Sequence, residues 1–205
     1  MAKKLVVVFA RAARYSVVKS RLARDLGQPE TLRFYRTTLA RILRTIGADP
    51  RWETMIALTP DTAVGAGDPL TVGYRAKAQG GGDLGARMVR ALRGAGSRPA
   101  VIIGSDIPDI TPARISAAFR ALGQAPFVLG PAADGGYWLI GARHPQRLRP
   151  YALAGIRWSS THTRADTVAV LGPNNVAILP FELEDIDDVQ AYRRWRARGA
   201  ARGTP

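Results

Sequence analysis

The chain has 205 residues, which suits one domain of ordinary size, and its 46% hydrophobic and 22% charged residues are typical of a folded globular protein. It contains no cysteine, which excludes disulfides, thiolate metal sites and cysteine nucleophiles, and no apolar run reaches the roughly 18 residues of a membrane helix. With 30 basic and 16 acidic residues the formal net charge is +14, so nucleic acid has to be considered as a partner.

The basic residues do not form a nucleic-acid-binding motif. Only four of them are lysines, and the arginines are scattered through amphipathic segments rather than gathered in one tract. Aromatic residues do not alternate with them as they do in RNA-recognition motifs. A nucleic-acid partner is therefore not expected, whereas general attraction to anionic ligands is.

Strands and helices alternate along the chain. Apolar runs predict the strands, and apolar residues at helical spacing predict the helices. In chain order the pattern predicts strand 5–9, helix 32–46, strand 54–58, a weaker strand 71–74, helix 84–92, strand 100–103, helix 111–122, strands 127–129 and 137–140, helix 159–171, strand 176–179 and helix 188–198.

This alternation predicts one α/β domain, a three-layer sandwich whose mostly parallel sheet of about six or seven strands carries helices on both faces. We expect the domain to span residues 1–198 and residues 199–205 to form a frayed tail. Arg11 follows the first apolar run directly and no small-residue cleavage site is present. The run is therefore interpreted as a strand of a cytoplasmic protein and not as a secretion signal.

Ligands of open α/β sheets bind beyond the carboxyl ends of the strands, so the loops at those ends are the candidate site. The first loop, residues 10–22, carries Arg11, Lys19 and Arg21 after a buried strand. Side-chain charges and backbone N–H groups there suit a polyphosphate, and a solvated basic loop is the alternative. The loop is not a P-loop, because G-x-x-x-x-G-K-[ST] is absent.

Two further loops are rich in glycine. Gln79 is followed by three glycines, which allow close backbone approach to a ligand, and then by Asp83, which is predicted to cap a helix. A flexible turn with an ordinary cap fits this segment equally well. Asp134-Gly135-Gly136 is either a plain turn between two strands or a carboxylate that faces a second substrate.

Two loops carry candidate metal-binding carboxylates. Asp106 follows a buried strand directly, which puts its carboxylate at the ligand edge of the sheet, with a hydrogen-bonded turn as the alternative. Residues 182–188 hold five of the 16 acidic residues of this basic chain. A bound metal or the surrounding arginines would each relieve their repulsion, and Asp188 is also a candidate cap for the last helix. His144 and His162 are interpreted as surface residues.

Six motifs occur in order across nearly the whole chain. They are F-A-[KR]-A-x-x-x-x-x-V-K-[ST]-R-L, Q-x-x-G-D-L-G, G-S-D-x-P-D, A-x-D-G-G-Y, W-S and D-[IV]-D. In these motifs the chain resembles a family of glycosyltransferases first described beside radical-SAM proteins, some of them named for arsenosugar biosynthesis. It is similar, more distantly, to the molybdenum cofactor guanylyltransferases and to the nucleotidyltransferases that make the deazaflavin cofactor precursor and CMP-sugars. The resemblance implies the GT-A, nucleotide-diphospho-sugar transferase fold.

The resemblance implies a nucleotide site and a metal site. Arg11, Lys19 and Arg21 would bind the nucleotide phosphates. The remaining nucleotide-binding residues would be Gln79, Gly82 and Asp83, near the base and ribose, and Ser105. Asp106 and Asp187 would hold Mg²⁺ or Mn²⁺.

It also implies an acceptor site. Asp134, Gly135 and Gly136 would face the acceptor or the sugar, and Lys19 and Asp134 would be the catalytic residues. The chain departs from the family in two places. Ala13-Arg14-Tyr15-Ser16 replaces P-x-P-G in the first loop, and Asp188-Val-Gln-Ala replaces T-P-E-D after the last motif.

The leading functional hypothesis is metal-assisted transfer of a sugar from a nucleoside diphosphate sugar to a small acceptor. The alternative is nucleotidyl transfer, in which a phosphorylated small molecule attacks a nucleoside triphosphate and pyrophosphate leaves. Both reactions need a metal and a basic loop, so the motifs do not separate them. A noncatalytic nucleic-acid-binding protein is the third hypothesis. No membrane partner is expected, and the oligomeric state stays open.

Overall fold

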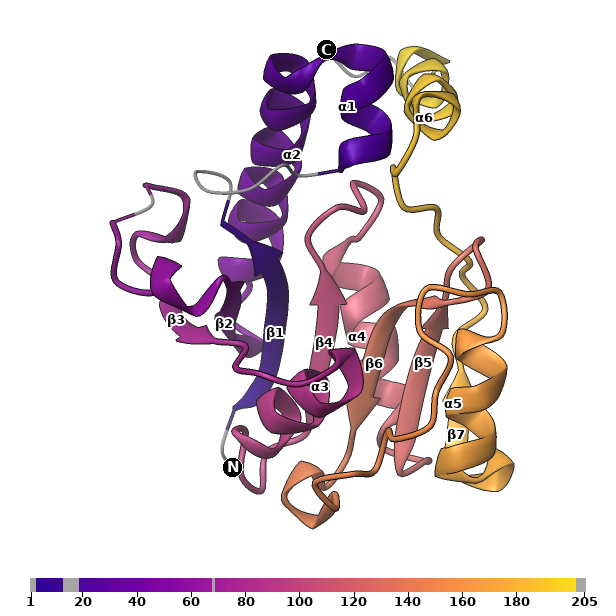
Figure 1. Cartoon of the computed structure of the whole chain (residues 1–205). Coiled ribbons are helices and arrows are strands. Elements are labelled where there is room, and N and C mark those ends of the chain that lie inside the picture. Colours follow the sequence, from indigo (N-terminus) through magenta and orange to yellow (C-terminus); the bar gives the residue numbers. More distant parts are fainter. Residues whose placement is uncertain (1–2, 13–18, 68, 202–205) are drawn as a thin grey trace.

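The computed structural model describes residues 3–12, 19–67 and 69–201, so the altered residues 13–16 of the first loop lie outside the described residues. Seven strands of this described part form one sheet in the order β3-β2-β1-β4-β6-β5-β7 (Figure 1). The strands are β1 (Lys4–Arg11), β2 (Trp52–Thr59), β3 (Arg75–Ala78), β4 (Ala100–Gly104), β5 (Phe127–Pro131), β6 (Tyr137–Ala142) and β7 (Val176–Ile178).

The α-helices connect these strands and cover both faces of the sheet. They are α1 (Ser20–Leu26), α2 (Gln28–Ile42), α3 (Leu84–Arg93), α4 (Pro112–Ala121), α5 (Thr163–Leu171) and α6 (Val189–Ala201). In Figure 1, α3 lies in front of the sheet and α4 behind it. The structure thus confirms the predicted three-layer α/β architecture with its mostly parallel sheet.

Strand direction decides which loops meet. β1 pairs in parallel with β2 and β4, β3 with β2, and β7 with β5, while β6 alone in the sheet runs antiparallel to its neighbours β4 and β5. The carboxyl ends of β1, β2, β3, β4, β5 and β7 therefore lie at the same edge. The turn between β5 and β6 opens at this edge as well, because β6 begins where β5 ends.

The core has one layer on each face of the sheet. Val6 and Val8 of β1 pack with residues of α2 and α4, whereas Leu5 and Val7 pack with residues of α3 and α5. This alternation follows from the period of two in a β-strand. It explains why the first strand is apolar at every position from 5 to 8, since both of its faces are buried.

A smaller apolar cluster holds three helices over the ligand edge. We call it the helical cap cluster; it consists of Leu22, Phe34, Ile186, Ala191 and Tyr192, with Leu26, Val189 and Trp195 against it. Phe34 packs edge to face against Tyr192, with the ring centroids 5.3 Å apart. α1, the start of α2 and α6 therefore stand together at the top of Figure 1.

Some predicted elements were wrong or shifted. Residues 71–74 are not a strand, because the chain makes a 3₁₀ turn at Pro69–Thr71 and Gly73 has a φ of +85°. The strand follows at Arg75–Ala78, a polar and largely exposed edge strand without the apolar run that marks buried strands. α1 was not predicted. α5 begins at Thr163, four residues after the predicted start, because residues 159–162 form turns.

The ends of α2 and α6 also differ from prediction. The predicted helix 32–46 begins earlier, at Gln28, and closes in a π-helical turn at Leu43–Gly47. α6 continues to Ala201, three residues into the segment expected to be frayed, and residues 202–205 lie outside the described part. Among the described residues, no helix has both the length and the apolar character needed to cross a membrane.

Candidate active site

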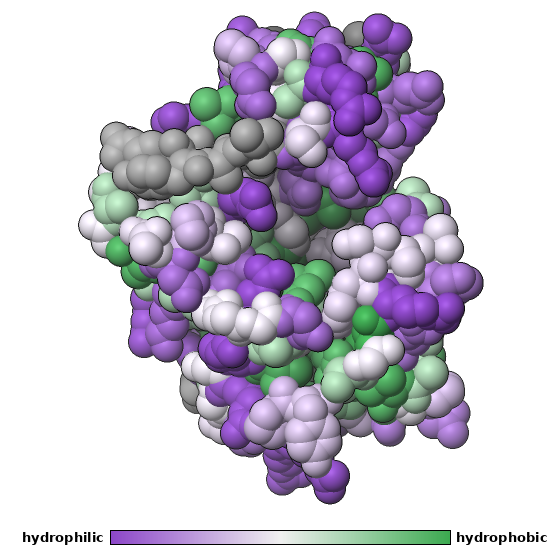
Figure 2. Space-filling view, in the orientation of Figure 1, coloured by the Kyte–Doolittle hydropathy of each residue, from purple (hydrophilic) through white to green (hydrophobic). Residues whose placement is uncertain are grey.

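Three predicted site residues from distant parts of the chain meet at the carboxyl edge of the sheet. Lys19 Nζ lies 3.0 Å from Asp106 Oδ2 and 2.5 Å from Asp187 Oδ1. Lys19 immediately precedes α1, Asp106 follows β4, and Asp187 lies just before α6. Figure 2 shows that the molecular surface is hollowed between the helices at the top and the body of the sheet below them.

The central group of this site is the Lys19 ammonium. Its side chain is only 5% exposed, compared with 33% for Asp106 and 53% for Asp187. Burial alone lowers the pKa of Lys19, but the charges of Asp106 and Asp187 outweigh it, so the pKa is raised above its ordinary value. Lys19 is therefore a fixed positive charge at neutral pH, held between two carboxylates.

Asp187 and Asp185 respond in opposite ways to the same surroundings. Burial acts to raise the pKa of Asp187, but the charge and hydrogen bond of Lys19 outweigh it and hold that pKa below its usual range. The pKa of Asp185 is raised to about 7, first by burial and then by the charges of Asp187, Asp106 and Asp134. Lys19 therefore keeps Asp187 ionised, whereas crowding with other carboxyl groups favours the protonated form of Asp185.

The donor set suits a hard divalent cation. In the described part of the chain, no three His, Asp or Glu side chains converge closely enough to hold a metal by themselves. Mg²⁺ needs only one or two protein carboxylates when phosphate oxygens and water complete its shell. Asp106 and Asp187 supply such oxygens at the ligand edge, so the residues fit Mg²⁺ or Mn²⁺. The position between their oxygens is taken by Lys19 Nζ.

A buried tyrosine fixes the start of the first loop. The Arg11 backbone N–H donates to Tyr35 Oη at 2.9 Å, and the Tyr35 hydroxyl donates to the Arg11 carbonyl at 2.8 Å. Ser105 Oγ lies 3.1 Å from the same hydroxyl, and burial raises the pKa of Tyr35. Tyr35 therefore joins the end of β1 to the loop of Ser105 and Asp106. From the sequence, Tyr35 was expected only to contribute to the apolar face of a helix. The one feature that could have indicated a further role is its hydroxyl group on that face.

The Gln79 side chain links β1, β2 and α3 at the same edge of the sheet. Its side-chain amide donates to the carbonyls of Ala10, at 3.3 Å, and Ala57, at 3.0 Å, which lie near the ends of β1 and β2. The side-chain oxygen of Gln79, Oε1, accepts a hydrogen bond from Arg87 at 3.1 Å. The Gln79 side chain is thus engaged by the protein, and its place at the ends of two strands sets where the glycine loop begins.

The glycine loop after Gln79 is held from two sides. Arg90 donates to the Gln79 carbonyl at 2.7 Å and to the Gly81 carbonyl at 2.9 Å, while Gly80 N–H donates to Asp61 Oδ1 at 3.1 Å. Asp83 caps α3 as predicted, accepting from Ala86 N–H at 2.8 Å. The loop is therefore an ordered structure.

Gly82 has a φ of +97°, which favours glycine at that position. The sequence did not single out Arg87 and Arg90, because arginines are scattered through most helices of this chain.

The Asp134 turn is also built from local hydrogen bonds. Asp134 Oδ1 accepts from Gly136 N–H at 2.8 Å. Gly135 has a φ of +87°, and a Cβ there would lie 2.6 Å from Thr161 Cα. The Gly135 carbonyl accepts from Arg164 N–H at 3.0 Å. The turn is thus pressed against the segment before α5, with its carboxylate exposed at the ligand edge.

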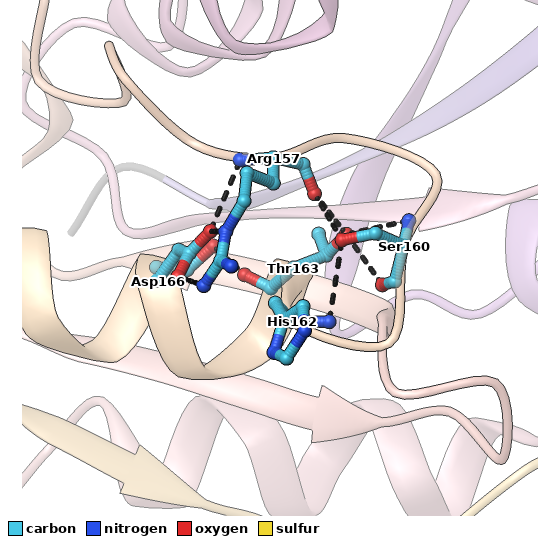
Figure 3. A network of polar contacts seen from close by, with 6 residues as sticks. Arg157, Ser160, His162, Thr163 and Asp166 are labelled. Atoms are coloured by element: carbon cyan, nitrogen blue, oxygen red, sulfur yellow. Dashed lines mark hydrogen bonds and ion pairs between the residues drawn. The ribbon is translucent and has the colours of Figure 1, made fainter.

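The segment that carries the W-S motif is stabilised by a polar network, drawn in Figure 3. The Arg157 guanidinium binds both carboxylate oxygens of Asp166, at 2.8 and 2.7 Å, and holds the pKa of Asp166 at about 2. The hydroxyls of Ser160 and Thr163 donate to the Arg157 carbonyl at 2.7 and 2.8 Å. This network fixes the path that the chain takes into α5.

The cluster of acidic residues before α6 has several partners. Glu184 pairs with Arg194 and Arg198, and Asp188 caps α6 by accepting from Ala191 N–H at 2.8 Å. Asp187 pairs with Lys19. Arginines, a cap and a lysine therefore relieve most of the repulsion. Asp185 is the member for which the described residues supply no cationic partner.

The structure thus brings Lys19, Asp106 and Asp187 into contact. Tyr35 links the Arg11 backbone to Ser105, the neighbour of Asp106. Four other predicted residues stand apart from this contact. The side chains of Arg11, at the end of β1, and Arg21, on α1, are exposed, whereas those of Gln79 and Asp83 are occupied by contacts within the protein.

A family model described as "Uncharacterized protein conserved in bacteria (DUF2064)" matches residues 42–160, which is more than half of the chain. The matched region runs from the end of α2 to the W-S motif and includes Asp106 and Asp134. No sequence among the curated proteins matches the chain.

Solved structures share the fold along the whole chain. A protein from Desulfovibrio desulfuricans G20 assigned as a nucleotide-diphospho-sugar transferase is 28% identical with a TM-score of 0.87, covering 97% of this chain and 88% of that one. CMP:2-keto-3-deoxy-manno-octonic acid synthetase complexed with CTP is 15% identical with a TM-score of 0.53, covering 98% and 100%. Glucosyl-3-phosphoglycerate synthase from Mycobacterium tuberculosis, in complex with Mg²⁺ and UDP, is 14% identical with a TM-score of 0.51, covering 100% and 80%. The two more distant structures show the fold alone.

Proposed function

The chain belongs to the DUF2064 family of bacterial proteins, and from the site at the carboxyl edge of its sheet we propose that it is a metal-assisted glycosyltransferase. It would move a sugar from a nucleoside diphosphate sugar to a small acceptor. The observation that carries the proposal is the convergence of Asp106 and Asp187 on one cation, the ammonium of Lys19. The similarity to a nucleotide-diphospho-sugar transferase over 97% of the chain supports it.

The basic residues would bind the diphosphate of the donor. Lys19 Nζ is a buried positive charge at the end of the first loop, and Arg21 lies two residues further on. A cation in a dry site stabilises developing negative charge more strongly than one in water. Asp106 and Asp187 would hold the divalent metal, which supplies further compensation for the charge of the departing diphosphate.

Other loops at this edge would bind the nucleoside of the donor and the acceptor or sugar. The ordered glycine loop allows the base and ribose to approach the backbone at Gly82, between Gln79 and Asp83. Ser105, oriented by Tyr35, would contact the nucleotide from the other side of β1. The exposed carboxylate of Asp134, in the turn formed with Gly135 and Gly136, would contact the acceptor or the sugar.

Nucleotidyl transfer is the second candidate, because a synthetase solved with CTP has the same fold. A phosphorylated small molecule would attack the α-phosphate of a nucleoside triphosphate, a new P–O bond would form, and pyrophosphate would leave. The same carboxylates and the same basic loop would serve this reaction. The released product separates the two functions, since sugar transfer releases a nucleoside diphosphate.

A thermal-shift screen tests the proposal first. The protein is heated with nucleoside triphosphates, nucleoside diphosphates and nucleotide sugars, each with Mg²⁺ or Mn²⁺. We expect a nucleotide sugar to raise the melting temperature in a metal-dependent way, and chromatography of the best ligand after incubation with candidate acceptors to show nucleoside diphosphate. Pyrophosphate release would instead establish the second candidate, and no stabilisation by any member of the screen would reject both.

A double variant tests the basic loop. Lys19→Ala with Arg21→Ala should weaken binding of the best nucleotide at least about 100-fold, because each charged hydrogen bond contributes roughly 1.5–3 kcal/mol. The matched control, Arg41→Ala with Arg44→Ala, removes the same charge at exposed positions near the opposite end of α2. Calorimetry on the two folded variants gives the comparison. Equal affinity in both would remove Lys19 and Arg21 from the nucleotide site.

A further inference from the structure

The cation that lies between Asp106 and Asp187 is an ammonium group of the protein itself. We propose that Lys19 is a resident counter-ion: it occupies the metal position in the ligand-free protein and moves to the nucleotide phosphates when metal and nucleotide bind together. The inference rests on the proposed function for its second half, the move to phosphate. Its first half, the competition between Lys19 and a metal, stands on the geometry of the described residues alone.

The geometry makes Lys19 and a metal mutually exclusive. Nζ lies 2.5 Å from one carboxylate oxygen and 3.0 Å from the other, and the lysine side chain is 5% exposed. A divalent ion bound by those two oxygens would occupy the same small volume. It would also meet the ammonium at close range, where like charges in a poorly solvated place repel strongly. Metal binding between Asp106 and Asp187 therefore requires Lys19 to leave.

The charge balance explains why Lys19 can be replaced. Two carboxylates, those of Asp106 and Asp187, flank one ammonium, so Lys19 compensates only part of their charge. A divalent ion compensates more. Lysine is also suited to exchange, because its ammonium is a compact charge on a flexible four-carbon stem, whereas the planar guanidinium of arginine would be tied to one geometry.

The destination of Lys19 determines how metal and nucleotide influence each other. If a metal binds alone, the displaced ammonium loses two charged hydrogen bonds and no phosphate replaces them. If phosphate is present, the phosphate oxygens give the ammonium new acceptors. Metal and phosphate should therefore bind cooperatively, and each should raise the affinity of the other by the same factor. Lys19 would thus act as a positioning residue that makes the metal site depend on the nucleotide.

Manganese binding without nucleotide tests the competition. Free Mn²⁺ is measured by electron paramagnetic resonance in titrations of EDTA-treated, re-purified wild-type protein and of Lys19→Met, which keeps a long unbranched side chain without its charge. We expect Lys19→Met to bind Mn²⁺ about tenfold more tightly or better, because the ion no longer has to break two charge-assisted hydrogen bonds. Unchanged or weaker affinity, including no detectable binding in either protein, would overturn the proposal.

Arg21→Met is the matched control for the loss of a nearby positive charge. Arg21 acts on Asp187 through its charge but does not lie between the two carboxylates. Its removal should raise the Mn²⁺ affinity much less than the removal of Lys19. An equal increase of the Mn²⁺ affinity in the two variants would show that only long-range electrostatics is at work, and it would reject the resident counter-ion.

A second measurement needs no variant. The chain has only four lysines, so side-chain ammonium spectra of protein labelled with ¹⁵N-lysine contain at most four signals. We expect one slowly exchanging signal in the ligand-free protein, and its shift or loss when Mg²⁺ and inorganic pyrophosphate are added together. An unchanged signal, under conditions where calorimetry shows pyrophosphate bound, would contradict the move to phosphate.

The two proposals fail in different ways. If no nucleotide or nucleotide sugar binds, the proposed function fails, while the Mn²⁺ titrations still decide whether Lys19 competes with a metal. If a sugar is transferred but the Mn²⁺ affinity of Lys19→Met equals that of the wild type, the proposed function stands and the resident counter-ion is rejected.

Discussion

Lys19 Nζ and Asp187 Oδ1 lie 2.5 Å apart, although 168 positions separate the two residues in the chain. The helical cap cluster explains this proximity. Leu22 of α1 and Ile186, the neighbour of Asp187, are both fully buried in that cluster. Apolar packing thus positions two charged side chains that attract each other, and the site inherits its geometry from the cluster beside it.

Replacing Asp106 or Asp187 by asparagine should change the free energy of unfolding little but abolish metal-dependent nucleotide binding. In Asp187→Asn, Lys19 keeps Asp106 as its partner, and the Asp187 side chain is half exposed, so the free energy of unfolding should fall by about 1 kcal/mol. The same holds for Asp106→Asn, with Asp187 as the remaining partner. Metal-dependent stabilisation by nucleotide should be lost in both. Urea unfolding and thermal shifts with and without Mg²⁺ measure the two effects, and surviving metal dependence in both variants would exclude the shared site.

Tyr35→Phe should loosen the start of the first loop. The change deletes the hydroxyl that pairs with both backbone groups of Arg11 and with Ser105, leaving those polar groups unsatisfied. A loss of about 1–3 kcal/mol in the free energy of unfolding is expected, with weaker nucleotide binding. Tyr74→Phe is the control, because Tyr74 donates one hydrogen bond to the Leu43 carbonyl, away from the carboxyl edge. If both variants bind nucleotide equally well, Tyr35 does not position the site.

Gly135→Ala should be more harmful than Gly65→Ala. Both glycines have positive φ, +87° and +81°, so alanine is strained by roughly 1–2 kcal/mol at either position. At Gly65 nothing lies within 4 Å of the added Cβ, whereas at Gly135 the backbone of Thr161 would have to move. Overpacking should add about 1–3 kcal/mol at Gly135 alone. Denaturant unfolding of the two variants gives the difference, and equal losses would mean that the turn is not pressed against Thr161.

The ion pair of Arg157 and Asp166 should make stability depend on acid pH. The pKa of Asp166 is about 2 in the folded protein, below its ordinary value of 3.8, so the folded state binds this proton less readily than the unfolded state. The pair therefore stabilises the protein above about pH 4, and this contribution is lost as the pH falls through 3.8 towards 2. Asp166→Asn should remove it.

Urea unfolding of the wild type and Asp166→Asn between neutral and acid pH measures this effect. Their difference in stability should be constant above about pH 5 and shrink steadily below pH 4. Asp25→Asn, at an exposed position of α1, controls for the loss of a carboxylate. A difference that does not change with pH would show that the ion pair is not the cause.

The sequence alone determined the features that depend on residues close together in the chain. Asp83, Thr111 and Asp188 accept hydrogen bonds from N–H groups three residues ahead, so their caps follow from the local order of residues. The buried strands are apolar runs, and their alternation with helices determined the three-layer architecture. Parallel strands then placed Asp106 at the ligand edge, because every parallel strand ends there.

Only the tertiary structure decided which cation lies between the carboxylates. From the sequence, a metal and the surrounding arginines were both answers to the crowding of acids before α6, and Lys19 was expected at phosphate. The choice depends on distances between groups that are far apart in the chain, and these distances are set by how α1 packs against α6. Side-chain packing first brings charged groups close together. Electrostatic attraction then decides which of these groups pair. A one-dimensional pattern of charges carries no information about that packing.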